Sequence, residues 1–545
     1  MPVNTRLPNI PKDDERPRIP FNIYYTIPHF KLFYYSYVFF GSFSLAWIAD
    51  YLPTIGKICL WTGFAITCGL IIAIHPSIHT ERMRLDEMGK SVRVRRPLIG
   101  FKRWEIPLDV DGINDGLYDD PDGNTDERLH DGCRYGLNIG NDPYTDTQLN
   151  FAYQSATDHN MKVFISFDFN WYNTNQTSEI GAKNRQFSSH SAQLRVDGKV
   201  FVSSFSGDRI YCSEMRSAAG GDIFLAPNYH PGQGNFNDID GALNWMGWES
   251  DGYNRAPTAE RKVSVIDGDT AYKVALGGKP YIAPISPWFS THFGDDVSYN
   301  KNRVFPSNLL WYSRWREILT TKPRFVEIIT WNDYGESHYI GPLSSPHTDD
   351  GSSKWVTDMP HNGWLDMAKP FISAYKAGST LPSNYLEEEK LIYWYWPTPK
   401  STNCDATIQS ANKASDSFFA AFGRPDGANT MQDSIFVVTQ LKQPALVEVT
   451  SGMNMQTFHA PAGIRAWTVP MGVGAQTFHV KRDGRMVDEL SGTSLRDIAD
   501  ECVCGIYNFN AYVGTLPADG EIDGLAPDGR ALLKQGLRVP CPLIH

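Results

Sequence analysis

The sequence predicts an α/β fold in which a (β/α)8 barrel is followed by an antiparallel β-sandwich and preceded by a transmembrane segment. Three observations lead to this prediction. Short apolar runs alternate with longer helical segments over residues 135–380, apolar runs recur at close spacing over 381–545, and two long uncharged stretches lie within 32–74. Alternating strands and helices are typical of parallel βαβ units, and closely spaced strands are typical of antiparallel sheets.

The composition describes a large folded body with an acidic balance of charge. Of the 545 residues, 41% are hydrophobic and 20% are charged, which is sufficient to bury a core. The net charge is −11, and because residues 1–96 carry 12 basic and 7 acidic side chains, the remainder carries −16. An acidic body does not follow a phosphate backbone, so we expect no nucleic acid partner. The aromatic content of 13% fits either an aromatic core or a surface that stacks on sugar rings.

Residues 1–96 form a basic front region with two apolar stretches. Residues 32–49 and 58–74 contain no charged side chain, and each is close to the length that spans ~30 Å of hydrocarbon at ~1.5 Å per residue. We therefore expect membrane association through these stretches. The basic cluster at 82–96 favours a cytosolic position for everything downstream, by the positive-inside rule. Residues 97–134 are acidic and turn-rich, which indicates a linker.

The barrel prediction depends on strand-like runs over residues 135–380. Seven apolar, β-branched runs are predicted strands: 136–140, 162–169, 199–206, 222–229, 241–248, 279–289 and 325–333. A barrel of this type needs eight strands, so the first one is missing or replaced. No G-x-G-x-x-G motif opens a helix, and no His, Cys, Asp and Glu residues have the spacing of a metal site. We therefore expect neither a cofactor nor a metal ion.

The region from 381 to 545 is expected to form the β-sandwich. Its predicted strands are short and separated by Gly and Pro turns, at 390–396, 434–441, 445–452 and 465–472. The last helix before it is expected over 364–378. The eight cysteines are too scattered for a zinc site. In an oxidising compartment, the pairing that we expect is Cys404 with Cys502 or Cys504.

Three carboxylates stand at the ends of predicted strands, where a parallel barrel builds its active site. Asp168 closes the apolar run 162–169, and Asp333 and Glu336 follow the last strand, on either side of a turn at Gly335. Hydrolysis of a glycosidic bond requires one carboxyl to protonate the leaving oxygen and a second to activate water or attack carbon. The alternatives are purely structural roles, in which Asp333 caps the following helix and Asp168 pairs with an arginine inside the barrel.

The neighbouring residues suggest which of Asp333 and Glu336 is the acid and which is the base. A carboxyl beside Trp331 and Tyr334 is partly desolvated, and desolvation raises its pKa towards that of a useful acid. We therefore expect Glu336 to be the acid and Asp333 the base. Asp168 then orients the sugar or the water, or shares the base role.

Polar and aromatic residues near the same strand ends are candidates for sugar binding, because aromatic rings stack on sugar faces. The candidates are Asn170, Trp171, Asn228, Tyr229, His230, Trp248, Trp288, Trp331 and Asn332, with Trp245 as a further possible platform. Each tryptophan fits a position in the core equally well, and His230 fits a hydrogen-bonded structural role.

Several long motifs carry a family resemblance. They are N-I-G-N-D-P-Y-T-D from Asn138, V-F-I-S-F-D-F-N-W from Val163, F-L-A-P-N-Y from Phe224, E-I-I-T-W-N-D-Y-G-E-S-H-Y-I-G-P from Glu327 and G-I-Y-N-F-N-A-Y-V-G from Gly505. In this order they resemble the signatures of glycoside hydrolase family 71, the fungal α-1,3-glucanases or mutanases. The likeness extends from about Tyr135 to the C-terminus.

The resemblance implies a (β/α)8 barrel with a C-terminal β-sandwich, no cofactor, and a monomer that hydrolyses α-1,3-glucan in cell walls or biofilm with inversion at the anomeric carbon. The essential carboxylates of the family match Asp168, Asp333 and Glu336. For inversion, the acid and base carboxyls are expected to stand roughly 6.5–9.5 Å apart. The resemblance also implies a secreted or cell-wall location, in conflict with the basic cluster behind the apolar stretches.

The front of the chain departs from the family pattern. The family begins with a strand of the type F-A-H-F, and nothing in residues 1–134 matches it convincingly. Either the front of the chain is altered and the barrel lacks its first strand, or part of 97–130, such as Leu98–Trp104, fills the gap. Loss of the strand implies a different function, that of a catalytically impaired, membrane-tethered relative that still binds glucan.

Overall fold

The computed structural model describes residues 98–103, 133–292, 301–341, 343, 353–356, 359–404, 424–501 and 507–518, with the backbone alone at 98–103, 133, 353 and 354. The chain divides into two compact units, Met1–Arg95 and Arg96–His545, and all described residues belong to the second. The apolar stretches 32–49 and 58–74 therefore lie outside the described residues. Within the described ranges, no helix combines the length and apolar character needed to cross a membrane.

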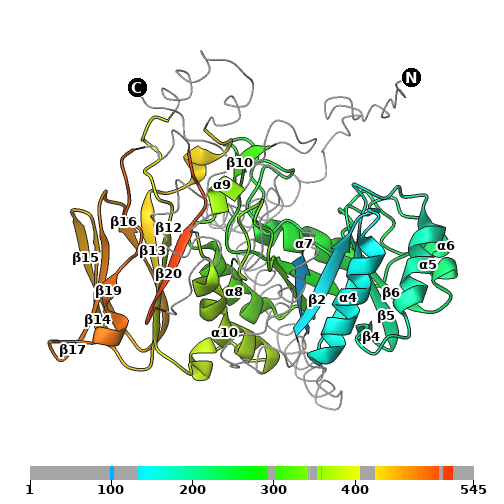
Figure 1. Cartoon of the computed structure of the whole chain (residues 1–545), viewed down its shortest axis with the longest axis horizontal. Coiled ribbons are helices and arrows are strands. Elements are labelled where there is room, and N and C mark those ends of the chain that lie inside the picture. The colour runs from blue at the N-terminus through cyan, green and yellow to red at the C-terminus, as the bar shows by residue number, and fades with distance from the viewer. Residues whose placement is uncertain are drawn as a thin grey trace, which may run out of the picture. The chain divides into compact units, whose positions relative to one another are not determined.

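The predicted α/β class is confirmed, and its main element is a parallel sheet (Figure 1). Eight parallel strands follow the order β6-β5-β3-β2-β1-β11-β8-β7, with the short antiparallel β4 (Arg195–Val196) beside β5. All seven predicted runs coincide with strands of this sheet. They are β2 (Cys133–Ile139), β3 (Lys162–Asp168), β5 (Lys199–Phe205), β6 (Ile223–Pro227), β7 (Ala242–Leu243), β8 (Tyr281–Ile285) and β11 (Phe325–Ile329).

The eighth strand is β1 (Leu98–Arg103), from the segment interpreted as a linker. It lies between β2 and β11 and is parallel to both, so that Gly100 is in register with Arg134 on one side and with Glu327 on the other. Two explanations were open for the missing first strand. The structure agrees with the one in which residues of the 97–130 segment fill the gap.

Hydrogen bonds also join the two ends of the strand order. The carbonyl oxygen of Leu225 in β6 accepts bonds from the backbone N–H groups of Asp240, at 2.9 Å, and Gly241, at 3.3 Å, immediately before β7. These two bonds connect β6 to the residues that lead into β7.

Helices connect most of these strands and pack on the outer face of the sheet. They are α4 (Thr145–Asp158), α5 (Thr177–Phe187), α6 (Cys212–Ala219), α7 (Val265–Leu276), α8 (Leu310–Thr321) and, after β11, the short α9 (Ser353–Val356) and α10 (Asn362–Lys376). The start of α7 shows why a helix forms there. Ser264 and Asp267 form a capping box, and Gly277 ends the helix in the left-handed region at φ 57°.

The opposite face of the parallel sheet is filled by a layer of phenylalanine rings from four strands. Phe201 packs against Phe164 at 4.8 Å, Phe224 at 5.7 Å and Phe325 at 6.2 Å between ring centroids. These rings lie towards the amino ends of their strands, and side chains two residues apart share a face. Asp168 therefore projects from the same face of β3 as Phe164, four residues further towards the carboxyl end. Apolar rings close one end of this face, and polar groups occupy the other.

The C-terminal region contains two antiparallel sheets that share an apolar core. One comprises β12 (Lys390–Tyr395), β13 (Ser434–Leu441), β16 (Gly463–Pro470) and β20 (Tyr512–Leu516), and the other comprises β14 (Ala445–Ser451), β15 (Asn454–Ala460), β17 (Gln476–Arg482), β18 (Arg485–Met486) and β19 (Gly492–Thr493). Tyr393 stacks on Phe478 across the two sheets, with ring centroids 4.1 Å apart. Short 3-10 helices lie at Pro382–Tyr385, Ala428–Thr430 and Asp488–Leu490. Cys404 is disulfide-bonded, and its partner lies outside the described residues.

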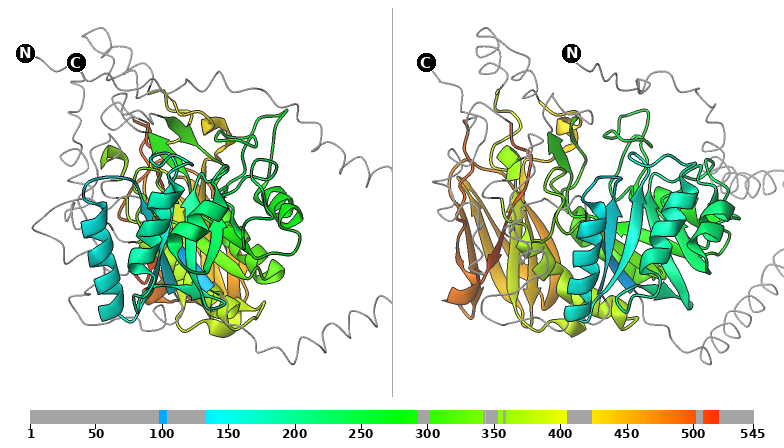
Figure 2. Two further views of the ribbon diagram at one scale, coloured as in Figure 1. Left: turned by 90° about the vertical axis from the view of Figure 1, so that its right-hand side faces the viewer. Right: turned by 45° about the vertical axis from the view of Figure 1, so that its right-hand side comes forward.

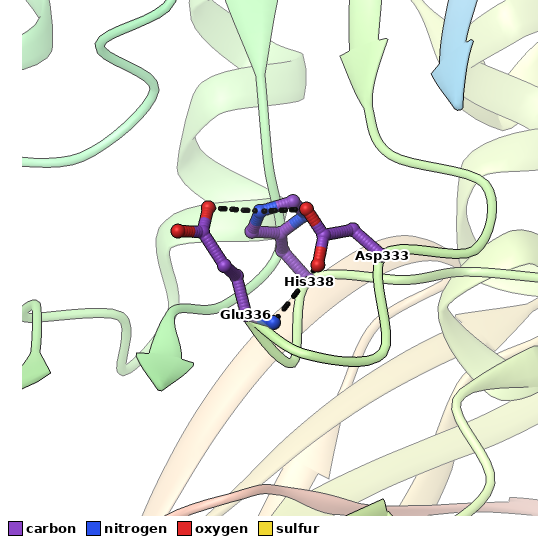
Figure 3. A group of neighbouring side chains, drawn as sticks. All are labelled: Asp333, Glu336 and His338. Carbon is purple, nitrogen blue, oxygen red and sulfur yellow. Dashed lines mark hydrogen bonds and ion pairs between the residues drawn. The ribbon is translucent and has the colours of Figure 1, made fainter. Parts of the chain in front are cut away.

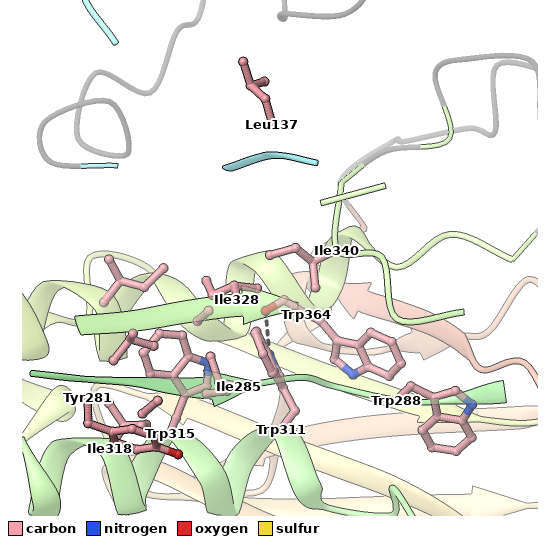
Figure 4. Close-up of a cluster of buried hydrophobic side chains, with 14 of the residues drawn as sticks. Leu137, Tyr281, Ile285, Trp288, Trp311, Trp315, Ile318, Ile328, Ile340 and Trp364 are labelled. Carbon is pink, nitrogen blue, oxygen red and sulfur yellow. Dashed lines mark hydrogen bonds between the residues drawn. The ribbon is translucent and has the colours of Figure 1, made fainter. Parts of the chain in front are cut away.

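Helices α8 and α10 lie between the first antiparallel sheet and the parallel sheet (Figures 1 and 2), and buried tryptophans form a layer there (Figure 4). Trp311 and Trp315 of α8 and Trp364 of α10 are completely buried, and the Trp311 indole N–H donates to the Trp364 carbonyl at 2.9 Å. Trp288 belongs to this layer, since its indole N–H donates to the carbonyl of Phe509 at 2.9 Å. The two regions therefore share one continuous core.

His361 forms a second connection, close to the end of β11. Its ring nitrogens lie 2.9 Å from the carbonyl oxygens of Tyr339 and Ala511, and its ring stacks on Tyr339 with centroids 3.8 Å apart. Asn510 donates to the Tyr339 hydroxyl at 3.2 Å. Residues just before β20 therefore support the loop that follows β11.

The central position of β1 generates a prediction. Phe101→Pro removes a backbone N–H from a strand that is paired with Tyr135 on one side and Ile328 on the other. We expect the free energy of unfolding to fall by about 2–4 kcal/mol, because a hydrogen bond is lost and its acceptor is left unpaired. Phe101→Val keeps the N–H and should cost less. Chemical denaturation of both variants measures the difference, and equal stabilities would contradict the pairing of β1.

Candidate active site

The loop that follows β11 brings two of the predicted carboxylates together (Figure 3). The chain turns back on itself, so that Thr330 N–H donates to the His338 carbonyl at 3.0 Å and Ile340 N–H donates to the Thr330 carbonyl at 3.1 Å. Within this loop the Asp333 carboxylate accepts the backbone N–H of Glu336 at 2.9 Å. Asp333 thus holds a turn of its own loop, and this local bond gives it its orientation.

The strand β9 (Ser290–His292), which pairs with β10 (Asn302–Val304), supports the loop from the side. Ser290 N–H donates to the Glu336 carbonyl at 3.1 Å, and the Thr291 hydroxyl donates to the Gly335 carbonyl at 3.0 Å. The same hairpin brings Lys301 to the site, because Lys301 directly precedes β10.

Glu336 is buried with a cation on one oxygen and an imidazole on the other. The Lys301 ammonium donates to Oε1, and His338 Nε2 lies 3.1 Å from Oε2. Burial opposes the charged form of Glu336, but Lys301 and His338 outweigh it and lower its pKa to about 2. Burial does act in the expected direction, but the expectation of a raised pKa for Glu336 is wrong in its net result, because a cation from a distant segment lies on the carboxylate.

The two carboxylates of the loop lie close together. His338 Nε2 is 3.6 Å from Asp333 Oδ2, and one oxygen of each carboxylate and a ring nitrogen of His338 lie within 4.8 Å of one another. This is shorter than the separation of ~6.5–9.5 Å expected for an inverting pair. Among the described residues, these three are also the group whose atoms are near enough to surround a metal ion. Lys301 already supplies a positive charge there, so the geometry does not call for one.

Asp168 stands at the carboxyl end of β3, in another part of the sheet. It is almost completely buried, and it accepts the backbone N–H of Asn170 at 2.8 Å and the Asn138 amide at 3.3 Å. Three strand positions separate β3 from β11, or about 14 Å measured along the sheet at ~4.8 Å per strand. Asp168 therefore lies at the carboxyl end of the sheet, as Asp333 and Glu336 do, but on a strand three positions away.

Four of the predicted sugar-binding residues have their polar groups committed to the protein interior. Trp248 donates to the Trp288 carbonyl at 2.8 Å, Trp288 is completely buried, and the Tyr229 hydroxyl lies 3.3 Å from Cys212 Sγ. Asn228 donates to the Leu243 carbonyl at 3.0 Å. The interpretation of these four side chains as sugar contacts is therefore corrected, because the three buried rings have no face available to a ligand and the amide of Asn228 is bound by Leu243 and Tyr272. Trp245 is likewise buried.

The other candidates remain near the surface or at the site. Trp171 is 47% exposed and directly follows the exposed Asn170, next to Asp168. Trp331 is half-buried against Tyr135, and the side-chain oxygen of Asn332 is buried without a hydrogen-bond partner among the described residues. His230 is half-exposed but bound by Asp208 at 2.7 Å, which fits the structural alternative.

Sequence reasoning missed Lys301, Thr330 and His338. For His338 a signal was present, because it lies two residues after Glu336 in the same loop. Lys301 gives no such signal, since it lies 35 residues before Glu336 and only the β9–β10 hairpin brings it near.

Comparison with known proteins identifies the family to which this chain belongs. Residues 132–525 match the model of glycosyl hydrolase family 71. A mutanase of Penicillium rubens is 42% identical over 399 residues, which cover 71% of this chain and 82% of that protein. A glucan endo-1,3-alpha-glucosidase of Schizosaccharomyces pombe is 36% identical over 403 residues, covering 70% and 87%. An ascus wall endo-1,3-alpha-glucanase of the same yeast is 28% identical over 405 residues, covering 69% and 88%.

Among solved structures, a GH99 endo-alpha-mannosidase of Bacteroides thetaiotaomicron aligns over 46% of this chain and 82% of its own, with 15% identity and a TM-score of 0.35. That score is too low to carry an argument about the fold. The family model, the mutanase and the glucan endo-1,3-alpha-glucosidase each match about 70% of this chain, and this agreement is sufficient to assign the family. The chain belongs to glycosyl hydrolase family 71.

Proposed function

We propose that this protein hydrolyses α-1,3-glucosidic bonds in α-1,3-glucan. The observation that carries the proposal is the pair Asp333 and Glu336, brought together on the loop after β11 in a chain of this family. The glucan endo-1,3-alpha-glucosidase and the endo-1,3-alpha-glucanase among its relatives bear names that specify this linkage. Hydrolysis of such a bond needs carboxylates and water but no cofactor.

For the fold, the proposal is a closed (β/α)8 barrel over β1–β11 and a β-sandwich over the two antiparallel sheets. Support for the barrel comes from the parallel pairing of β1 with both β2 and β11 and from the bonds of Asp240 and Gly241 to Leu225. The stacking of Tyr393 on Phe478 supports the sandwich. The alternative of an impaired, membrane-tethered glucan-binding relative rested on a lost first strand, and Leu98–Arg103 removes that reason.

For location, the proposal is an exported enzyme with a membrane anchor at residues 32–49 and 58–74. The disulfide at Cys404 supports an oxidising compartment for the body of the chain, since cytosolic thiols are kept reduced. One relative is named as an ascus wall enzyme.

The assignment of roles follows from charge. Glu336 is held ionised by Lys301 and His338, so it does not suit the part of proton donor in the ligand-free enzyme. Two like charges this close oppose each other, and the neighbouring Asp333 is therefore the better site for a proton while Glu336 is ionised. This reverses the order expected from the sequence: Asp333 is the acid, and Glu336 stabilises the positive charge that develops on the sugar.

Asp168 is then the base, on the other side of the scissile bond. The donors from Asn170 and Asn138 favour its ionised form, as a base requires. The spacing of Asp333 and Glu336 leaves no room for a water molecule between them, whereas Asp168 stands on a different strand. This arrangement keeps the inverting mechanism that the family resemblance implies.

The first prediction concerns Glu336. Glu336→Gln keeps the shape but removes the charge, and we expect the hydrolysis of insoluble α-1,3-glucan to fall by about 100-fold or more. Release of reducing ends measures it. Glu260→Gln, at an exposed position, is the matched control and should retain full activity. Full activity of the Glu336 variant would exclude this carboxylate from the reaction.

A second prediction concerns stereochemistry. Attack by water from the side opposite the leaving oxygen should release the β-anomer first, and proton NMR of the first turnover products separates it from the α-anomer. If the α-anomer appears first, the reaction retains configuration. Asp333 and Glu336 are then the acid and nucleophile, which fits their close spacing, and the role of Asp168 as base is wrong.

A third prediction separates acid from base. Fluoride leaves without being protonated, so α-glucosyl fluoride does not need the acid. Asp333→Asn should therefore lose activity on glucan but keep much of its activity on the fluoride, whereas Asp168→Asn should lose both. The opposite pattern in steady-state rates would exchange the two assignments.

A further inference from the structure

His338 occupies an unusual position for a polar side chain beside a catalytic loop. It is completely buried, and its ring is surrounded by Trp248, Phe289 and Trp245, with centroids 5.3, 5.9 and 6.4 Å away. Two tryptophans expected to stack on sugar rings therefore enclose this histidine. Such a cage leaves the imidazole little freedom to turn, and its hydrogen bonds are fixed in direction.

The hydrogen bonds of the loop determine which ring nitrogen of His338 carries the proton. The Asp333 backbone N–H donates to Thr330 Oγ1 at 2.9 Å, and Thr330 Oγ1 lies 3.0 Å from His338 Nδ1. The ionised carboxylate of Glu336 beside Nε2 can only accept, so it requires the proton of a neutral ring on Nε2, and the Thr330 hydroxyl can then donate its own proton to Nδ1. Nδ1 is then an acceptor, and the proton of a neutral ring is on Nε2. That N–H donates to Glu336 Oε2 at 3.1 Å.

The surroundings favour this neutral form. Among the described residues, the charged or titratable groups near the ring are Glu336, Asp333, Lys301 and His361. Burial is the largest effect and lowers the pKa of His338, although Glu336 acts in the opposite direction. A neutral ring has a single N–H to donate. The shorter contact assigns it to Glu336, since Asp333 Oδ2 is 3.6 Å away.

We propose that His338 is a positioning residue that fixes the Glu336 carboxylate through a hydrogen bond from Nε2, while the hydroxyl of Thr330 holds the ring at Nδ1. The proposal rests on the proposed function, because Glu336 is the group through which His338 acts. Lys301 neutralises one oxygen of the carboxylate, and His338 directs the other. Rotation of the carboxylate is thereby prevented before the substrate arrives.

Two substitutions of His338 form a matched pair. The side-chain nitrogen of glutamine reaches the position of Nε2, whereas that of asparagine reaches only as far as Nδ1. We expect His338→Asn to lower kcat by about tenfold to 100-fold, the value of one hydrogen bond to a charged group, with little change in KM. His338→Gln should retain more of the activity. Comparable losses of kcat in both variants would overturn the proposal.

Thr330 offers a second pair that leaves the ring in place. Thr330→Val removes the hydroxyl that holds the ring at Nδ1 and should lower kcat in the same way as His338→Asn. Thr330→Ser keeps the hydroxyl and should retain more activity. Thermal unfolding of all four variants shows whether each is folded at the assay temperature. If a His338 variant does not fold, the Thr330 pair decides.

The pH dependence provides a readout that a purely structural role would not move. Loss of the Nε2 donor makes the ionised form of Glu336 less favourable, so the limb of the kcat/KM profile that Glu336 controls should move up by about one pH unit in His338→Asn. An unchanged limb would contradict a hydrogen bond from Nε2.

An infrared titration makes the test independent of turnover. The carboxyl band missing in Glu336→Gln identifies Glu336, and its titration should move to higher pH in His338→Asn. If the wild-type protein cleaves no α-1,3-glucan but this band moves, the proposed function fails while the positioning bond stands. If the protein is active and the band does not move, the positioning bond is wrong.

Discussion

The negative charge of a buried carboxylate must be compensated by nearby groups. At the carboxyl ends of the parallel strands, here called the mouth of the sheet, this constraint applies to Glu336. An isolated charge in the interior costs several kcal/mol, and a single partner seldom repays that cost. Here Lys301 lies on one oxygen and His338 on the other. Each partner depends on a different element: the β9–β10 hairpin presents Lys301, and the loop itself presents His338 inside its aromatic cage. The geometry of the site therefore depends on the packing of three segments that are distant in sequence.

The antiparallel sheets take part in the same arrangement. His361 and Asn510 bind Tyr339, which directly follows His338, and the Trp311–Trp364 layer fixes α8 and α10 against the first antiparallel sheet. The loop after β11 is thus held from the parallel sheet by β9 and from the C-terminal region by His361. This gives the second region a structural part in positioning the site, without any requirement that it touch the substrate.

Much of the scaffold could be predicted from the sequence, because apolar runs that alternate with helices have a strong local pattern. The seven strands and the positions of Asp168, Asp333 and Glu336 were found in this way. β1 was only one of two alternatives, since LIGFKR lies beside a long acidic, turn-rich segment and gains its meaning from pairing with β2 and β11. Lys301 and the charge of Glu336 could not be predicted, because an ion pair across 35 residues depends on tertiary packing. The sequence also did not separate buried from exposed tryptophans.

That last distinction decides what the aromatic residues do. Trp288, Trp311, Trp315, Trp364, Trp394 and Trp396 are completely buried, so a large part of the tryptophan content serves the shared core. Trp248 and Trp245 enclose His338. Among the described tryptophans near the site, Trp171 beside Asp168 and Trp331 beside the loop have an accessible face. The two sides of the mouth therefore differ. On the β3 side an exposed ring lies beside Asp168, and on the β11 side Lys301 and His338 surround the carboxylate of Glu336. For the proposed α-1,3-glucan substrate, a stacking surface on one side and a fixed ion pair on the other would give the protein a physical basis for distinguishing the two directions of the chain.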